Sequence, residues 1–386
     1  MTEPNTPASV RQTTAITDTG VRLTSNQLLK LIDDNVADLI AVINSDKKRI
    51  WHNEAYCRTL GYGRQDLAEG HSQVQVHEED LPKVQEIFEM AMKTGKAAPC
   101  AYRMQRKDGE WIHLESNAKV VDLEDQGRCL ILVARDVSER VRLEKQLRDE
   151  LAEAADYVRS LLPPPIDKPV RAHWRFVPST SLGGDAFFYE WVDDRIFRFG
   201  LLDVCGHGMG AALLSISAVN CLRARGLQNT DFHNPAEVLS GMNKAFPMEE
   251  HGERFFTMWY GVYDREKREL TYASAGHPAA ILTGGAGGQQ HLETVGGAVG
   301  IFPDMKFSNK TQILDDQAIL YLFSDGVFEL QDTDGREWPI ADFMKLLEPQ
   351  HQDPEKELER IMTTTKLVAG SESFDDDYSM LRLTFL

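Results

Sequence analysis

The sequence predicts an α+β protein with two domains joined by a helical connector. The chain has 386 residues, too many for one ordinary hydrophobic core, and its 42% hydrophobic and 26% charged residues are typical of globular proteins. Strand-like runs and amphipathic helical pieces alternate up to about residue 137, and strands with glycine loops follow from residue 171 onward. Between them, the highly charged stretch Glu139–Leu162 contains no Gly or Pro and favours one long helix.

Charge and hydropathy exclude several classes of protein. The formal net charge of −18 argues against a nucleic-acid-binding protein, because contact with phosphates needs a basic face. The chain has no apolar run of the roughly 18 residues that span a bilayer, and its first residues lack the apolar segment of a signal peptide. Five cysteines without a CxxC pair favour reduced thiols over a disulfide framework. We therefore expect a cytoplasmic protein that binds neither nucleic acid nor a membrane.

The N-terminal part is predicted to be a polar, disordered tail, residues 1–24, followed by a mixed domain, residues 25–137. The expected strands are Leu39–Ile43, Arg49–Trp51, Cys100–Gln105, Ile112–Val120 and Cys129–Val133. The expected helices are Asn53–Leu60, Arg64–Glu69 and Glu78–Lys93, the last with an apolar face. Asp108-Gly109 is a strong hairpin signal. Two strands, short helices and a three-stranded meander indicate an α+β domain.

Residues 138–162 are predicted to be a coiled-coil linker. The apolar residues of this stretch are spaced by 4, 4, 3, 4 and 3, and they are Leu143, Leu147, Leu151, Ala154, Val158 and Leu161. A parallel two-stranded coil is favoured because the stretch joins two domains and carries charges on both flanks. The alternative is a single amphipathic helix packed on a neighbouring domain. Pro163–Pro165 would end the helix sharply.

The C-terminal domain, residues 163–386, is dominated by strand-like runs. The expected strands are Arg195–Leu202, Arg254–Tyr263, Glu269–Ala275, Ala279–Thr283, His291–Val295, Lys306–Leu314, Ala318–Phe323 and Tyr378–Phe385. The expected helices are Ala211–Arg223, Asn234–Ala245 and Pro354–Ala369. Many antiparallel strands with a few long helices predict a two-layered sheet core with helices outside.

Four acidic positions in this domain lie beside strand ends or glycine turns. Asp185 follows a glycine pair, Asp203 ends an apolar strand, Asp325 follows another, and Asp375–Asp377 precede the last strand. Converging carboxylates repel one another unless a cation holds them, and oxygen ligands suit Mg²⁺ or Mn²⁺ better than Zn²⁺. The pattern therefore predicts a divalent-metal cluster.

The N-terminal domain resembles a PAS sensor domain over roughly 110 residues. The resemblance is carried by Trp51–Tyr62, by the hairpin Lys107–Trp111 and by the exit segment Ala134–Arg140. It implies a sensor of a ligand or of redox state, and it leaves that ligand unknown. His52, His71 and His77 could be haem ligands, although surface or structural roles are the simpler interpretation. Cys57 and Cys100 are interpreted as small core residues.

The C-terminal half resembles the SpoIIE-type branch of the metal-dependent (PPM) serine/threonine protein phosphatases, over about residues 165–386. Six motifs in order carry the resemblance, namely Leu182–Asp185, Asp203–Gly208, Phe256-Thr257, Ala275–Pro278, Phe323–Gly326 and Asp376–Leu381. The resemblance implies an α-β-β-α sandwich with two Mn²⁺ or Mg²⁺ ions between the sheets.

The same resemblance implies a role for each acidic residue. Asp185 would serve one metal, Asp203 would bridge both, and the carbonyl of Val204 would complete the contacts, so that Asp185 and Asp203 act in catalysis through the metals. Asp325 and Asp376 would hold the other metal. Asp377 is an alternative to Asp376, because three acids stand in a row.

Together, the two resemblances imply a phosphatase gated by a PAS sensor. Two bridged metals would activate a water that attacks phosphorus in line. The implied substrate is a phosphorylated anti-anti-sigma protein with a STAS domain, in a partner-switching pathway. The chain would form a homodimer through its coiled coil and the sensor domain.

The sequence also departs from the eukaryotic members of the phosphatase family. Cys205 stands where those members carry a leaving-group histidine, and their phosphate-binding arginine has no clear match. His207 or His277 could replace the histidine, although a packing or turn role is the simpler interpretation.

Two other functions were considered from the sequence. A pseudophosphatase would bind a partner without turnover, and the loss of a metal ligand would mark it, whereas all four acids are present. A metal-dependent phosphodiesterase would need residues that read nucleotide bases around the metals, and the net charge of −18 disfavours it.

Overall fold

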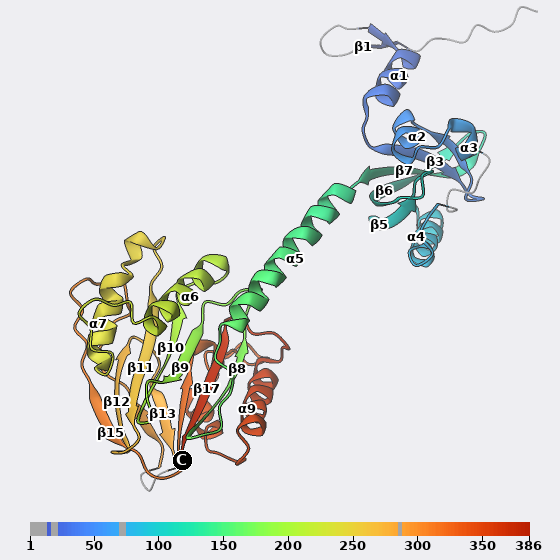
Figure 1. Ribbon diagram of the computed structural model, residues 1–386. Helices are drawn as coiled ribbons and strands as arrows, with labels where there is room; N and C mark the ends of the chain where they lie inside the picture. Colours follow the sequence, from blue (N-terminus) through green and yellow to red (C-terminus); the bar gives the residue numbers. More distant parts are fainter. Residues whose placement is uncertain (1–13, 17–21, 69–74, 285–287) are drawn as a thin grey trace, which may run out of the picture. The chain divides into compact units, whose positions relative to one another are not determined.

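A computed structural model describes residues 14–16, 22–68, 75–284 and 288–386 (Figure 1). The chain divides into two compact units, residues 1–148 and 149–386. Across the described ranges, we find no helix with the length and apolar character needed to cross a membrane.

The N-terminal unit is built on a five-stranded antiparallel sheet with the order β4-β3-β7-β6-β5. Its strands are β3 (Leu39–Asn44), β4 (Arg49–His52), β5 (Cys100–Gln105), β6 (Trp111–Leu123) and β7 (Gly127–Asp136). Its helices are α1 (Ser25–Asn35), α2 (Glu54–Leu60), α3 (Arg64–Ala68) and α4 (Leu81–Thr94). The strands and the last three helices match those expected from the sequence, and they form the α+β sensor fold that the motifs implied.

Local chemistry explains how the helices attach to this sheet. The side chain of Asn53 accepts a hydrogen bond from the backbone N–H of Tyr56 and caps α2. The same side-chain oxygen accepts a hydrogen bond of 3.0 Å from the backbone of Ile40 in β3. Inside the unit, the buried Arg49 donates to the hydroxyl of Tyr56 at 3.0 Å. Asn53 therefore joins the start of α2 to β3.

The beginning of the chain differs in part from the expected tail. Thr14–Ile16 (β1) pairs with Arg22–Thr24 (β2) in a two-stranded antiparallel sheet. The rest of the predicted tail lies outside the described residues, so its disorder stays a prediction. His71, one of the histidines considered as a haem ligand, also lies outside them.

The C-terminal unit contains two five-stranded antiparallel sheets. One has the order β15-β12-β11-β10-β9 and the other β14-β13-β16-β17-β8. The strands of the first are β9 (Ala186–Trp191), β10 (Ile196–Val204), β11 (Phe256–Asp264), β12 (Glu269–Ala275) and β15 (Lys310–Ile313). Those of the second are β8 (Val170–Val177), β13 (Ala280–Thr283), β14 (Gln290–Leu292), β16 (Ala318–Phe323) and β17 (Tyr378–Phe385).

The two sheets pack face to face, and helices cover their outer faces (Figure 1). The buried core between the sheets includes Phe199, Trp259 and Leu383. Helices α6 (Met209–Arg223) and α7 (Pro235–Ala245) cover the first sheet. Helices α8 (Ile340–Leu346) and α9 (Pro354–Ala369) cover the second. This arrangement is the α-β-β-α sandwich that the sequence motifs implied.

Helix α5 spans Ser138–Ser160, close to the predicted linker of residues 138–162. None of its residues is buried, and the side chains of Leu143 and Leu147 are 51% and 58% exposed. Apolar surface left exposed at these two positions fits a helix that pairs with a second copy, whereas Val158 and Leu161, at the other end of the seam, lie against the C-terminal unit. The coiled coil itself stays a prediction.

Candidate functional site

The site begins where β10 ends. Asp203 is the second-last residue of the strand and lies opposite Thr257 of β11. The chain then turns through Gly206 and Gly208, both with positive φ, into α6. The strand therefore anchors the carboxylate of Asp203, while the glycines allow the sharp turn behind it.

Asp185 lies directly before β9, the neighbour of β10 in the sheet. A Cβ atom on the preceding Gly184 would lie 2.9 Å from the carbonyl oxygen of Val204, so only glycine allows the two loops to approach this closely. Asp185 is 2% exposed, and neither of its carboxylate oxygens has a hydrogen-bond partner among the described residues. Burial raises the pKa of Asp185 well above its usual value, and the charges of Asp203 and Asp377 add to the rise.

The two remaining acids come from the other sheet. Asp325 begins a short 3₁₀ turn, Asp325–Val327, directly after β16, and Asp376 precedes β17. Burial raises the pKa of Asp203 to about 7, and the charge of Asp325 is the next largest cause, followed by that of Asp376. Burial and the charge of Asp376 likewise raise the pKa of Asp325. The fold therefore brings the four carboxylates of the sequence prediction into one neighbourhood.

The donor set suits a hard divalent cation. The carboxylates raise one another's pKa, and Asp185 is buried without a hydrogen-bond partner, so a cation would supply the missing counter-charge. Within the described ranges, no three His, Cys, Asp or Glu side chains are already arranged closely enough to hold a metal ion. The four acids therefore lie near one another but not at the short distances of a formed metal site. Their roles as ligands stay a prediction.

Asp377 has a different task from its neighbour Asp376. Its carboxylate accepts hydrogen bonds from the backbone N–H of Gly184 at 2.5 Å and from that of Ser179 at 2.8 Å. The hydroxyl of Ser179 donates to the same carboxylate at 3.0 Å. Asp377 is 4% exposed, whereas Asp376 is exposed. Asp377 therefore clamps the loop that carries Asp185, and this geometry favours Asp376 over Asp377 as the metal ligand.

The backbone of Asp377 also holds the Asp325 turn. Its carbonyl oxygen accepts a hydrogen bond of 3.0 Å from the hydroxyl of Ser324 and lies against Gly326, where a side chain would collide with it. One residue thus connects the loops of three predicted ligands. The sequence showed three acids in a row but contained no signal for this clamp, because Ser324 lies 53 positions away and Ser179 and Gly184 lie more than 190 positions away.

A cleft of ≈ 400 Å³ opens beside Asp203 and Asp325. His277 lines it and is 6% exposed, and its Nδ1 lies 2.7 Å from the hydroxyl of Thr257. The Nε2 atom of His277 has no hydrogen-bond partner among the described residues. Burial lowers the pKa of His277 to about 3, so the ring is neutral at pH 7. The other two positions considered for proton transfer, Cys205 and His207, are both exposed in the turn after β10.

The last turn of the linker helix lies close to this centre. The carbonyl of Leu161 accepts a hydrogen bond of 2.8 Å from Arg223 at the end of α6. Leu161 also lines a small cavity of ≈ 20 Å³ together with Asp185 and Val219 of α6. Beyond it, the carbonyl of Pro164 accepts a hydrogen bond of 2.7 Å from Tyr189 of β9. The end of α5 is therefore packed against the two elements that flank Asp185.

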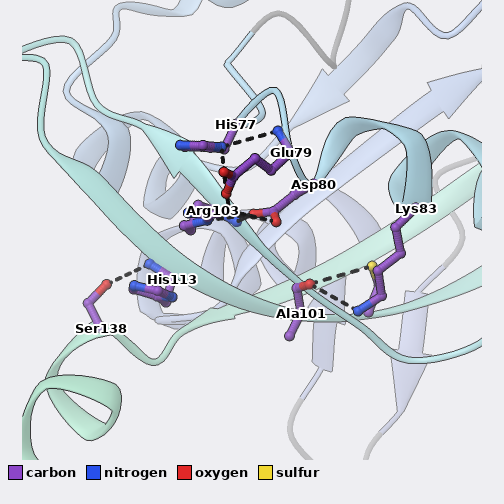
Figure 2. Close-up of polar contacts among 9 residues, drawn as sticks. His77, Glu79, Asp80, Lys83, Ala101, Arg103, His113 and Ser138 are labelled. Carbon is purple, nitrogen blue, oxygen red and sulfur yellow. Dashed lines mark hydrogen bonds and ion pairs between the residues drawn. The ribbon is translucent and has the colours of Figure 1, made fainter. Parts of the chain in front are cut away.

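In the N-terminal unit, an apolar cavity of ≈ 60 Å³ lies inside the sensor fold and is lined by residues that include Tyr56, Cys100 and Tyr102. Among the histidines considered as haem ligands, His52 is buried and its pKa is lowered, first by burial. His77 accepts a hydrogen bond from the backbone of Glu79 at 3.2 Å (Figure 2) and packs against the ring of Trp111. The contacts of His77 favour a structural role.

The exit from the sensor fold is also held by hydrogen bonds. The backbone N–H of His113 in β6 donates to the hydroxyl of Ser138, the first residue of α5, at 2.8 Å (Figure 2). The next N–H before that helix, of Val137, donates to the carbonyl of His113, also at 2.8 Å. The start of α5 is thus tied to the sheet that surrounds the cavity.

A pH-dependent stability of the metal-free protein follows from the raised pKa of Asp203. Its pKa is about 7 in the fold and 3.8 in its ordinary state, so the unfolded chain releases this proton first as the pH rises. The folded protein with Asp203 protonated is therefore the more stable form. This stabilisation is fully present below about pH 4 and is lost as the pH rises through about 7. Asp203→Asn removes the buried charge, and we expect it to stabilise the metal-free protein at pH 8 by about 1–3 kcal/mol relative to wild type.

The measurement is thermal or urea unfolding of wild type and Asp203→Asn in chelator at pH 4.5 and 8. The difference between the two proteins should be small at the lower pH, and titrating groups remote from the four acids cancel in it. Asp304→Asn, at an exposed position, is the matched control. A wild-type protein as stable as Asp203→Asn at pH 8 would contradict this prediction.

Comparison with known proteins places the two units in known families. Residues 193–386 match the family model described as Stage II sporulation protein E (SpoIIE), and residues 49–134 match the model of the PAS fold. Phosphoserine phosphatase RsbU of Bacillus subtilis is 28% identical over 246 residues, which cover 62% of this chain and 71% of RsbU. Phosphoserine phosphatase RsbP of the same organism is 28% identical over 207 residues. That alignment covers 50% of this chain and 51% of RsbP, so the chain spans about half the length of RsbP.

A solved structure supports the fold of the C-terminal unit. The SiaA-PP2C domain of Pseudomonas aeruginosa has a TM-score of 0.54 and 21% sequence identity to this chain. The match covers 63% of this chain and 99% of that domain. At this identity the likeness concerns the fold alone.

Proposed function

Since the chain belongs to the family of stage II sporulation protein E (SpoIIE), we propose that it is a metal-dependent serine/threonine protein phosphatase gated by its PAS domain. The observation that carries the proposal is the gathering of Asp185, Asp203, Asp325 and Asp376 at adjoining strand ends of both sheets, with Asp185 buried and unpartnered. A fold holds acids in such a place at a cost in stability, which a bound cation offsets.

The roles of the residues follow from their positions. Asp185, Asp203, Asp325 and Asp376, with the carbonyl of Val204, would hold two Mn²⁺ or Mg²⁺ ions. When bound, the pair would lower the pKa of a shared water and neutralise charge on the phosphoryl group. Asp377 keeps the Asp185 loop and the Asp325 turn at a fixed separation. His277 is neutral at pH 7, so its Nε2 can donate or accept one hydrogen bond but carries no charge.

A positive charge also lies at the turn after β10. The guanidinium carbon of Arg254 is 2.7 Å from the position that a Cβ atom of Gly210 would occupy, at the start of α6. No ion pair of Arg254 is found within the described part of the chain. Since Arg254 does not line the cleft itself, we assign it an electrostatic role, in which its charge attracts the phosphorylated substrate toward the turn after Asp203.

The proposed substrate is a phosphorylated serine or threonine of an anti-anti-sigma protein with a STAS domain. The relatives RsbU and RsbP are named phosphoserine phosphatases, which supports phosphoserine as the substrate class. The test incubates the full chain with phosphorylated STAS-domain proteins of the same genome and measures phosphate release with Mn²⁺, with Mg²⁺ and with chelator. We expect release from at least one of them that depends on the metal. Binding without release would instead support a pseudophosphatase, and hydrolysis of nucleotide diesters alone would support a phosphodiesterase.

The proposed gating acts through α5. The helix starts on the sensor sheet at Ser138 and ends against α6 and Asp185 at Leu161. A rotation of its last turn would therefore shift the loops that carry two predicted ligands. The exposed seam at Leu143 and Leu147 supports a parallel homodimer, in which the two helices would turn together.

A further inference from the structure

We propose that the cleft beside Asp203 and Asp325 binds the polypeptide around the phosphorylated residue and selects a segment with a Lys or Arg side chain next to it. This proposal rests on the proposed phosphatase function and adds a preference among substrates. The cleft has ≈ 400 Å³, enough for two or three side chains beside the reacting group.

The charges of the cleft indicate a basic occupant. Glu293 and Glu329 line it in addition to the predicted ligands, and both side chains are exposed. Within the described residues, neither glutamate pairs with a Lys or Arg, and no Lys or Arg lines the cleft. Bound metals would neutralise the four aspartates but leave these two charges in place. A cationic side chain of the substrate is the complement that they lack.

The cleft also has an apolar lining. It includes Phe328 together with Ile340 and Met344 of α8. Ile340 is 57% exposed, so a bound segment would cover apolar surface that is open to water in the free protein. An extended segment suits such a mixed lining, because its successive side chains point in opposite directions and can meet different kinds of neighbour.

A buried polar atom marks the same cleft as a binding site. His277 lines it, and its Nε2 is buried without a hydrogen-bond partner among the described residues. Buried polar atoms are rarely left unpaired, and with a small shift of the ring toward the cleft a carbonyl or phosphoryl oxygen of a bound segment would pair with this one in place of the nearby backbone of Phe323. Thr257 holds the ring in place through Nδ1, so the free nitrogen keeps one direction.

The test uses two phosphoserine peptides that differ only in a Lys or a Glu beside the phosphoserine, and p-nitrophenyl phosphate as a small ester without a neighbouring side chain. With full-length wild type, we expect kcat/KM to be about fivefold or more higher for the Lys peptide, which is the effect of two partly exposed ion pairs. Glu293→Lys should remove or reverse this preference and leave hydrolysis of p-nitrophenyl phosphate unchanged. Glu329→Gln is the second variant, in case the first one folds poorly, and it is judged by the ratio of kcat/KM for the two peptides alone, because the charge of Glu329 also acts on Asp325.

Glu124→Lys is the matched control. It makes the same charge change at an exposed glutamate in the turn between β6 and β7 of the N-terminal unit. Equal kcat/KM for both peptides, with active hydrolysis of p-nitrophenyl phosphate, would overturn the cleft proposal and leave the phosphatase intact. If no ester is hydrolysed under any metal condition, the phosphatase function itself fails, and the preference with it.

Discussion

Asp325→Asn is expected to lower kcat for phosphoserine hydrolysis by about 100-fold or more, with the fold retained. The substitution keeps the shape of the side chain but removes the charge that a metal needs. Asp325 lies in the Asp325–Val327 turn on the surface of the cleft, and its backbone carbonyl rather than its side chain accepts the bonds from Phe328 and Glu329. The turn should therefore form without the carboxylate.

The measurement is metal-dependent phosphate release by the purified full-length variant, together with circular dichroism and a thermal unfolding curve. Asp304→Asn, a neutralised aspartate on the exposed surface, is the control for the change in net charge. Wild-type activity of Asp325→Asn at saturating Mn²⁺ would refute the four-aspartate assignment.

Comparing the activity of Asp376→Asn with that of Asp377→Asn distinguishes a metal ligand, expected at Asp376, from a residue that only holds the ligand loops, expected at Asp377. Asp376→Asn should be as inactive as Asp325→Asn. Asp377→Asn keeps one carbonyl oxygen for the N–H of Gly184 or of Ser179 but loses the second acceptor. It should therefore lose stability, by about 1–2 kcal/mol, and need more metal while retaining measurable kcat.

Insertions into α5 after Gln146 are expected to change basal activity according to their length. Three or four extra residues rotate everything after them by about −60° or +40° relative to the sensor, whereas seven residues nearly restore the phase. Because the last turn of α5 contacts α6 through Leu161 and Arg223, a rotation should alter the Asp185 loop. We expect activity changes of about tenfold for the first two insertions and little change for the third.

The three insertion variants and wild type are compared by metal-dependent phosphate release at equal concentration. Light scattering at tens of micromolar reports whether each one is a dimer, as the exposed seam at Leu143 and Leu147 leads us to expect. Equal activity in all four proteins would mean that α5 only connects the two units and does not transmit a signal between them. A monomeric wild type would refute the coiled coil.

The sequence by itself determined the regular elements and the type of site. Apolar periodicity predicted α9 at Pro354–Ala369 and β16 at Ala318–Phe323 with the bounds that the structure has. It did so because period and capping are local properties of the chain. The motifs around Asp203 and Asp325 likewise identified the candidate acids, since each acid ends a recognisable apolar strand.

Some elements were not visible in the sequence. β9 was not predicted, because Ala186–Tyr189 is buried on both faces and shows no alternation. β8 was likewise assigned no boundaries, and α1 and α8 were not predicted at all. The strand pair of β1 and β2 depends on contacts between residues in a polar stretch without periodicity.

Only the tertiary structure decided how the acids differ from one another. Asp376 and Asp377 are adjacent in the chain, yet one is exposed and the other is buried against the loop of Ser179 and Gly184. In the same way, the unpaired Nε2 of His277 and the position of Arg254 against Gly210 arise from segments that meet only in the fold. Burial, pKa and hydrogen-bond partners depend on which distant residues share a space. A local pattern specifies a strand or a turn. It does not show which distant residues will bury a side chain and so change its pKa.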